Sequence, residues 1–272
     1  MPKHPLTIAK TAIIFQGKGA LPIVRNSFIQ MSKLTNLKGR INYISSHARQ
    51  ENLYAVYETT DRKFWTELAK CNQEEFMKSG TEGTCIEARE LIIALPESFV
   101  DYEPDKLLKL FTEHFKQKYG VECIAALHHN KRKTNYHIHL IFSERRLLDE
   151  PMEKIATRNM FYDETGKHVR TKKEILDEAG QLRCGCRIIP KGEVYERNIF
   201  TIKDSRFKCD SFLDEAKRSY TDLINIYVRD DEEKLKVFDK NGVYLPMKKV
   251  GKNNPKAEQI EADNRVCTMW IQ

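Results

Sequence analysis

The sequence predicts an α+β fold in which an antiparallel β-sheet is covered by helices on at least one face. Short runs of β-branched and apolar residues end at proline, glycine or polar segments, as strands do. Longer segments carry apolar residues at helical spacing. Around the histidine-rich segment 123–145 these elements follow one another as strand, helix, strand, strand.

The first elements are read from apolar spacing and from turn residues. Residues 6–15 are expected to form a strand before the glycine-rich turn at 17–19. In the unit 33–57, apolar residues first recur at helical spacing and a polar segment then leads to Leu-Tyr-Ala-Val-Tyr. A clearer helix is expected at 61–77, with Gly80 at its C-terminal cap.

The later elements surround and follow the histidines. A strand is expected at 87–95, where a proline stops it, and an amphipathic helix at 104–119, with its proline in the first turn. Hairpin-like turns are expected at 162–167 and 189–193, with basic residues between them. Ser211 is expected to cap a helix that runs to Tyr227.

Composition points to a cytoplasmic protein without membrane insertion. The chain has 272 residues, of which 40% are hydrophobic and 31% charged, and no apolar run approaches the roughly 18–20 residues of a membrane span. Its start does not resemble a secretory signal, and seven scattered cysteines suit a reducing compartment. A net charge of +7 suits a polyanionic partner.

His137 and His139 share one face of an extended strand, because side chains alternate along a strand. Neutral imidazoles side by side suit a catalytic divalent ion. A third imidazole comes from His128 or His129 if the run 123–127 pairs with the later strand as a hairpin. We favour His128, and the choice between these neighbours stays open at this point.

Basic residues near the histidines are candidates for contact with an anion. Lys131, Arg132 and Lys133 lie in the segment that joins the two expected strands, which places positive charge beside the proposed ion. Arg145 follows the second strand, and it either contacts phosphate or forms a structural ion pair with a carboxylate.

These residues resemble the MobA/MobL-type (MobQ/MobP-like) plasmid mobilisation relaxases of the histidine-hydrophobe-histidine endonuclease superfamily. Three motifs carry the resemblance in the right order: Asn42-Tyr43-Ile44, the strand 88–96 with Glu90, and Ala-Leu-His128 followed by His137-x-His139. Together they cover roughly residues 1–150, and the segment 212–225 resembles the helix that follows the family's catalytic core.

The resemblance implies a fold and a division of the chain. It implies a relaxase-like two-layer sandwich with a C-terminal hairpin and helix extension. Residues 1–150 would form the catalytic core with the metal site, and residues 151–250 a basic hairpin and a helix that complete the domain. Residues 251–272 would be a polar tail, and a truncation of the chain there stays open.

The resemblance also implies the activity. Such relaxases attack one phosphodiester of single-stranded DNA with a tyrosine hydroxyl, which leaves a 5′-phosphotyrosine and a free 3′-hydroxyl. This site- and strand-specific nicking and rejoining at a transfer origin starts the conjugative mobilisation of a plasmid or integrative element. Single-stranded DNA at that origin, accessory relaxosome proteins and a coupling protein are the implied partners.

The implied site residues follow from the matched motifs. Tyr43 would be the nucleophile, and a Mn²⁺ or Mg²⁺ ion would be held by the histidines named above. Glu90 would accept the second ring N–H of a ligand histidine, and Glu87 is the nearest substitute. A salt-bridged glutamate and a tyrosine packed in the core are the structural alternatives.

The neighbourhood of Tyr43 favours it among the tyrosines. A phenol with an ordinary pKa of about 10 is a weak nucleophile at neutral pH and needs a positive neighbour or a base. Lys38 and Arg40 precede Tyr43 and are expected to bind DNA, and Arg49 follows it. His47 is the second candidate, because some relatives of this enzyme class use histidine.

Other functions stay open. A rolling-circle replication initiator shares the histidine pair, but it usually has its tyrosine after the histidines, and here Tyr43 precedes them. A non-catalytic DNA-binding module would keep the histidines as structural residues. A zinc hydrolase is disfavoured, because no His-Glu-x-x-His helix is evident.

Overall fold

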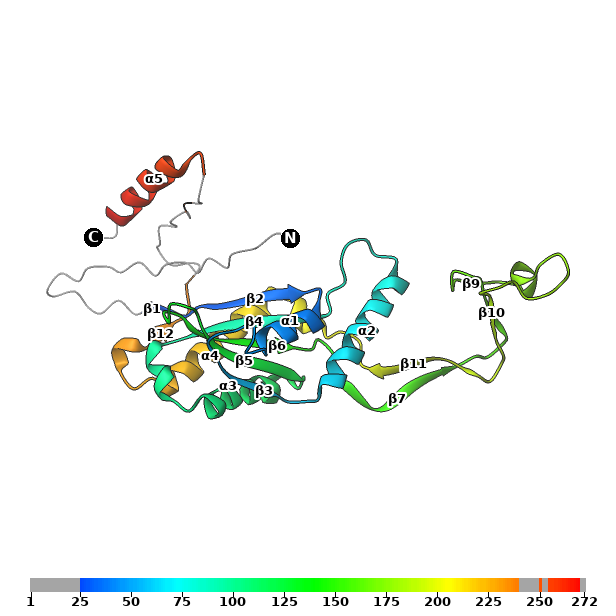
Figure 1. Ribbon diagram of the computed structural model, residues 1–272, viewed down its shortest axis with the longest axis horizontal. Coiled ribbons are helices and arrows are strands. Elements are labelled where there is room, and N and C mark those ends of the chain that lie inside the picture. The colour runs from blue at the N-terminus through cyan, green and yellow to red at the C-terminus, as the bar shows by residue number, and fades with distance from the viewer. Residues whose placement is uncertain (1–24, 240–249, 251–253, 270–272) are drawn as a thin grey trace.

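The computed structural model describes residues 25–239, 250 and 254–269 (Figure 1). The expected strand at 6–15 and the turn at 17–19 lie outside the described residues. The centre of the molecule is a five-stranded antiparallel sheet. Helices cover this sheet, so the α+β class and the antiparallel sheet are confirmed.

The sheet order is β2-β4-β6-β5-β3. Two predictions are confirmed: a proline ends β4, and a polar turn joins β5 to β6. No strand was predicted at β2, whose surface residues are polar. The bounds are β2 Ile29–Leu34, β3 Leu53–Glu58, β4 Ala88–Leu95, β5 Cys123–His129 and β6 Tyr136–Phe142.

Two helices cover the sheet face to which β6 contributes its odd-numbered residues. Helix α1 (Leu37–Ile44) begins at Asn36, whose side chain accepts a hydrogen bond from Gly39 N. Helix α2 (Arg62–Ser79) ends at Gly80, whose φ of 63° is the left-handed cap that glycine adopts without strain. Apolar residues of both helices pack on Ile141 of β6 and on the neighbouring strands.

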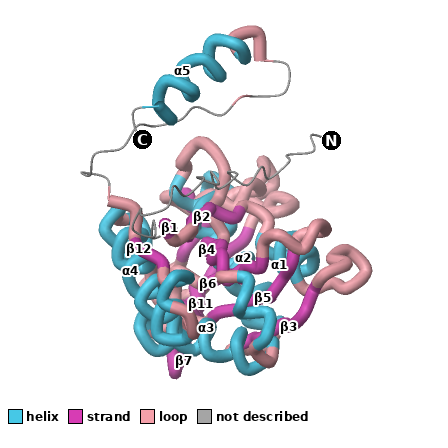
Figure 2. The backbone as a smooth tube through the Cα atoms, turned by 90° about the vertical axis from the view of Figure 1, so that its left-hand side faces the viewer, coloured by secondary structure: helices cyan, strands magenta, loops and turns pink. Residues whose placement is uncertain are grey.

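Helices α3 (Pro104–Tyr119) and α4 (Asp210–Tyr227) cover the opposite face. Figure 2 shows this pair on the other side of the strands from α1 and α2. The phenylalanine-rich core here includes Phe111, Phe115 and Phe212. The expectation that Ser211 caps α4 is wrong: the helix begins after Cys209, and Ser211 lies inside its first turn.

An arm projects from the sheet in Figure 1. Its stalk is the antiparallel pair β7 (Leu147–Ile155) and β11 (Val194–Phe200). A small sheet at its far end contains β8 (Met160–Tyr162), β9 (His168–Val169) and β10 (Arg187–Ile189). The basic segment 167–173 therefore lies at the tip of the arm.

The remaining elements are short or lie toward the end of the chain. The two-residue strands β1 (Arg25–Asn26) and β12 (Leu235–Lys236) pair in parallel, and α5 spans Ala257–Met269. Among the described residues, none of the helices combines the length and the apolar character needed to cross a bilayer. The 3-10 turns are η1 Glu97–Asp101, η2 Lys172–Ile175, η3 Ser205–Lys208 and η4 Asp231–Glu233.

Arg145 is a buried structural residue, so the ion-pair alternative describes its surroundings. Its side chain pairs with Glu75 and donates to Asn72 Oδ1 at 2.8 Å and to the Thr201 carbonyl at 2.8 Å. These bonds join α2 to the segment after β11. A guanidinium that is 2% exposed and already bonded on both sides is not presented to DNA.

Replacing Arg145 with methionine should therefore destabilise the fold. We expect Arg145→Met to lower the free energy of unfolding by roughly 2–4 kcal/mol, because each acceptor left without a donor in the interior costs about 1–3 kcal/mol. Urea unfolding followed by circular dichroism measures this. Arg146→Met, at the exposed neighbouring position, is the control, and equal stabilities of the two variants would contradict the structural role.

Candidate active site

Strand pairing brings three histidines together. In the register of β5 with β6, His128 lies opposite His137 and Ala126 lies opposite His139. The ring centroids are 5.9 Å apart for His128 and His137, 5.0 Å for His128 and His139, and 4.8 Å for His137 and His139. All three imidazoles therefore form one cluster on the face covered by α1 and α2.

His129 lies on the other face of the sheet. Its ring is 5.4 Å from that of Tyr136, and its Nε2 is 3.3 Å from a carboxylate oxygen of Glu97. Alternation along β5 separates the two neighbours, so His128 joins the cluster and His129 does not.

The tautomers of His137 and His139 are set by hydrogen-bond acceptors. His139 Nδ1 is 2.9 Å from Glu90 Oε1, and His137 Nδ1 is 3.0 Å from the Asn135 carbonyl. A carboxylate and a carbonyl only accept, so both Nδ1 atoms carry hydrogen, and in the neutral rings both Nε2 atoms present lone pairs. The two Nε2 atoms are 3.1 Å apart.

At this distance a ring that carries hydrogen on Nε2 donates it to the other Nε2, whereas two unprotonated Nε2 atoms repel each other unless a cation lies between them. Bonds from imidazole to a metal such as zinc are about 2.0–2.1 Å long, so nitrogens 3.1 Å apart can bind the same ion. His137 and His139 thus fit a divalent ion. The Asn135 carbonyl is a backbone acceptor that no side-chain pattern in the sequence could have indicated.

His128 is hydrogen-bonded to the end of α1. Its Nε2 is 2.7 Å from the Ile44 carbonyl and donates its hydrogen to that oxygen. In this arrangement Nε2 is not available to a metal. His128 completes a three-histidine set only if its ring releases Ile44 or binds through Nδ1.

Glu90 connects the histidines to α1. Its carboxylate accepts from Arg40 Nε at 3.0 Å and from Arg40 Nη2 at 2.8 Å, in addition to His139. Burial alone raises the pKa of Glu90, but the hydrogen bond and charge of His139, together with the Arg40 guanidinium, outweigh burial and lower it. Glu90 is therefore an anion that fixes both neighbours.

Arg40 is engaged inside the protein. Besides its two-pronged pairing with Glu90, its guanidinium lies 5.4 Å from the centroid of the Tyr43 ring. A guanidinium at this distance is attracted to the face of the aromatic ring. Arg40 was expected to bind DNA, and in the structure its guanidinium joins the carboxylate of Glu90 to the ring of Tyr43.

Tyr43 stands at the edge of this cluster with 45% of its surface exposed. On α1 it is close to Arg40, which bonds Glu90, and it precedes Ile44, whose carbonyl bonds His128. The structure therefore brings Tyr43 beside the histidines, with its side chain open to solvent. His47 is exposed in the turn after α1.

The other expected residues occupy different places. Glu87 accepts from Leu37 N at 2.7 Å and from Gln73, so it supports the start of α1. Lys131, Arg132 and Lys133 are exposed in the turn between β5 and β6, close in the chain to His128 and His137. Lys38 is exposed on α1 and lines a cavity.

Comparison with known proteins identifies the family. The model of the MobA/MobL family matches residues 47–257. The chain belongs to the MobA/MobL family. The match contains Glu90 and the three clustered histidines and begins four residues after Tyr43. Membership in the MobA/MobL family supports the role of a mobilisation relaxase that binds DNA.

Other comparisons add little. A chain solved in work on the molecular basis of vancomycin resistance transfer in Staphylococcus aureus is 14% identical, with 74% of this chain and 91% of that chain covered. The TM-score is 0.39, and we draw no argument from it. A search of curated proteins found no match.

The metal-free protein should lose stability in acid through this cluster. Burial and then the charge of His139 lower the pKa of His128 to about 3 and that of His137 to about 4, against an ordinary 6.5. The two neutral histidines therefore make their full contribution to the free energy of unfolding above pH 6.5. This contribution is lost as the pH falls from 6.5 to about 4 for His137 and to about 3 for His128.

Thermal unfolding in chelator, measured at several pH values from 7 to about 4, tests this expectation. His137→Gln should show a weaker decline of Tm with falling pH than the unaltered protein. His47→Gln removes an exposed histidine and should retain the full decline. Identical pH profiles for His137→Gln and the unaltered protein would contradict the assignment.

Proposed function

We propose that this chain is a DNA relaxase that nicks and rejoins one strand at a transfer origin, so that a plasmid or integrative element can be mobilised. The observation that carries the proposal is the convergence of His137 Nε2 and His139 Nε2, 3.1 Å apart, beside α1 with its exposed Tyr43. Family membership supports the same reaction class.

Tyr43 is the proposed nucleophile. Its hydroxyl oxygen attacks the scissile phosphorus, a Tyr43–O–P bond forms, and the bond from phosphorus to the 3′ oxygen breaks. The phenol loses its proton and the released 3′ oxygen gains one, so the step is balanced. Attack of that 3′-hydroxyl on the phosphotyrosine reverses the reaction and reseals the strand without an external energy source.

Arg40 and Glu90 position the reacting groups. Arg40 places positive charge 5.4 Å from the Tyr43 ring centroid, beside the hydroxyl that would attack the phosphate. Glu90 holds Arg40 and keeps the hydrogen of His139 on Nδ1, which leaves the His139 Nε2 lone pair free.

The histidine cluster is the proposed site of Mn²⁺ or Mg²⁺. His137 and His139 fit such an ion through Nε2, and His128 is the third proposed ligand. When bound, a divalent ion supplies positive charge to the non-bridging oxygens of the scissile phosphate. Imidazole ligands favour Mn²⁺ over Mg²⁺.

The exposed cations near this centre are the proposed DNA contacts. Lys131, Arg132 and Lys133 project from the turn between the two histidine-bearing strands, where they would bind backbone phosphates and add salt-dependent affinity. The reaction would take place in the cytoplasm, with accessory relaxosome proteins and a coupling protein as further proposed partners.

Covalent capture tests the nucleophile. Incubation with a labelled single-stranded oligonucleotide of transfer-origin sequence and Mn²⁺ should give a protein-DNA adduct on denaturing gels. We expect Tyr43→Phe to abolish the adduct, because the hydroxyl that forms the phosphate ester is gone. Chelator should also abolish it.

Tyr54→Phe is the matched control, because Tyr54 is another partly exposed tyrosine, on β3. An adduct that survives Tyr43→Phe moves the nucleophile to His47 or to another tyrosine. Cleavage without an adduct would indicate a hydrolytic nuclease. Absence of cleavage and adduct with the authentic origin would favour a non-catalytic DNA-binding module.

Replacement of Glu90 tests its positioning role. We expect Glu90→Gln to weaken Mn²⁺ binding by about 10–100-fold, as loss of a carboxylate behind a ligand histidine typically does. Titration calorimetry with Mn²⁺ measures the affinity, and circular dichroism checks the fold. Glu113→Gln, which removes a carboxylate bonded to Tyr57, should bind Mn²⁺ normally, and equal affinities would contradict the role of Glu90.

A further inference from the structure

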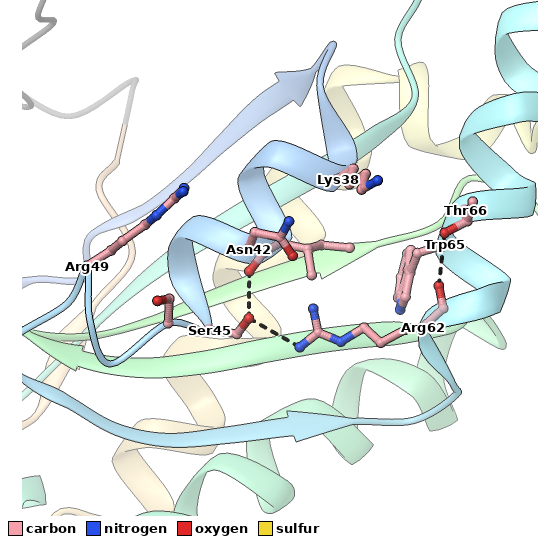
Figure 3. A pocket seen from close by; sticks show the side chains of 9 residues that line it. Lys38, Asn42, Ser45, Arg49, Arg62, Trp65 and Thr66 are labelled. Carbon is pink, nitrogen blue, oxygen red and sulfur yellow. Dashed lines mark hydrogen bonds between the residues drawn. The ribbon is translucent and has the colours of Figure 1, made fainter.

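A cavity of about 640 Å³ lies between α1 and α2. Figure 3 shows Arg62 and Trp65 reaching from α2 toward α1 across it. Lys38 and Asn42 line it from α1, and Ser45 and Arg49 line it from the turn that follows. The volume is within the range of sites that hold small ligands.

The lining of this cavity is cationic. Lys38, Arg49 and Arg62 contribute positive charge, and none of the described lining residues is an aspartate or glutamate. Arg62 is balanced by Glu58, with an ion-pair distance of 2.5 Å, and it also donates to Ser45 Oγ at 3.1 Å. Lys38 and Arg49 have no carboxylate partner in the described part of the chain.

The charges of the lining indicate the kind of ligand. Cations without a matching acid fit an anion with several acceptor oxygens, and a phosphodiester group has this chemistry.

The position of the cavity relates it to Tyr43. Lys38 and Asn42 lie at helical spacing along one flank of α1, and Ser45 continues this flank just after the helix, whereas Arg40 and Tyr43 lie on the opposite flank. A helix with its side chains is about 10–12 Å across. A DNA strand that crosses α1 would therefore place one phosphate beside Tyr43 and a nearby phosphate beside the cavity.

We propose that the cavity between α1 and α2 binds a phosphodiester group of the DNA strand that flanks the scissile phosphate, with Lys38 and Arg49 as its main contacts. This inference rests on the proposed relaxase function and specifies where the substrate strand continues beyond Tyr43. By holding the strand on both flanks of α1, the cavity fixes the position of the scissile group relative to the phenol.

The test measures DNA binding apart from cleavage. Binding of a fluorescein-labelled single-stranded transfer-origin oligonucleotide is followed by anisotropy in chelator at several salt concentrations. In Lys38→Gln/Arg49→Gln, we expect the slope of log affinity against log salt to become shallower by about 0.7, because one phosphate contact of a single strand is lost. Lys208→Gln/Arg218→Gln removes the same charge from the α4 side and should keep the slope.

Trp65 gives a second, local signal. The chain has two tryptophans, so Trp270→Phe leaves Trp65 as the sole emitter. The oligonucleotide should change its fluorescence, and the change should be absent when Lys38→Gln/Arg49→Gln is added. If inorganic phosphate or a mononucleotide at micromolar concentration gives the full change, the cavity is a site for a free anion and the proposal is overturned.

The outcomes separate this inference from the relaxase proposal. If the unaltered protein forms the Tyr43 adduct but the double variant keeps the salt slope of the control, the cavity is not a DNA site and the relaxase function stands. If no adduct forms but the slope and the Trp65 signal change as expected, the cavity is a phosphate site in a DNA-binding protein. Absence of any binding overturns both.

Discussion

The pairing of β5 with β6 is the constraint on which the site depends. It sets His128 opposite His137 and places His139 one alternation further along the same face. A shift of this register by one residue would turn the histidines toward the α3 and α4 layer. The register is held by two different cores, because Ile138 and Leu140 pack on one face and Ile141 on the other.

Charge then couples this sheet to the helix that carries the tyrosine. Glu90 comes from β4, Arg40 from α1 and His139 from β6, and the carboxylate bonds both partners. Two donors around one buried carboxylate keep it ionised, and the carboxylate in turn fixes which nitrogen of His139 is protonated. The same ion pair is thus a structural link between layers and the feature that prepares the histidine for a cation.

Helix α1 is short, and its position comes from contacts at several points. Glu87 accepts from its first residue, Asn36 caps it, and His128 donates to the carbonyl of its last residue, Ile44. These contacts hold the helix flat on the sheet, with the Tyr43 flank and the cationic cavity on opposite sides. A helix of eight residues has little stability of its own. Its packing on the sheet therefore sets the directions in which its two flanks face.

The sequence by itself determined the elements with strong local signals. Helix α3 was predicted at its observed bounds, because Pro104 favours a first turn and apolar residues recur at helical spacing after it. The Gly80 cap and the end of β4 before Pro96 followed for similar reasons. Period-two alternation also determined that His137 and His139 share a face.

Only the tertiary structure decided how distant residues pair. It placed His128 rather than His129 in the cluster, and it paired Arg40 with Glu90 and Arg145 with Glu75. It also added β2, which the sequence analysis did not predict. The partners in these two ion pairs lie 50 and 70 residues apart, so no local pattern specifies them. The cavity between α1 and α2 has the same origin, because it exists only where the two helices meet over the sheet.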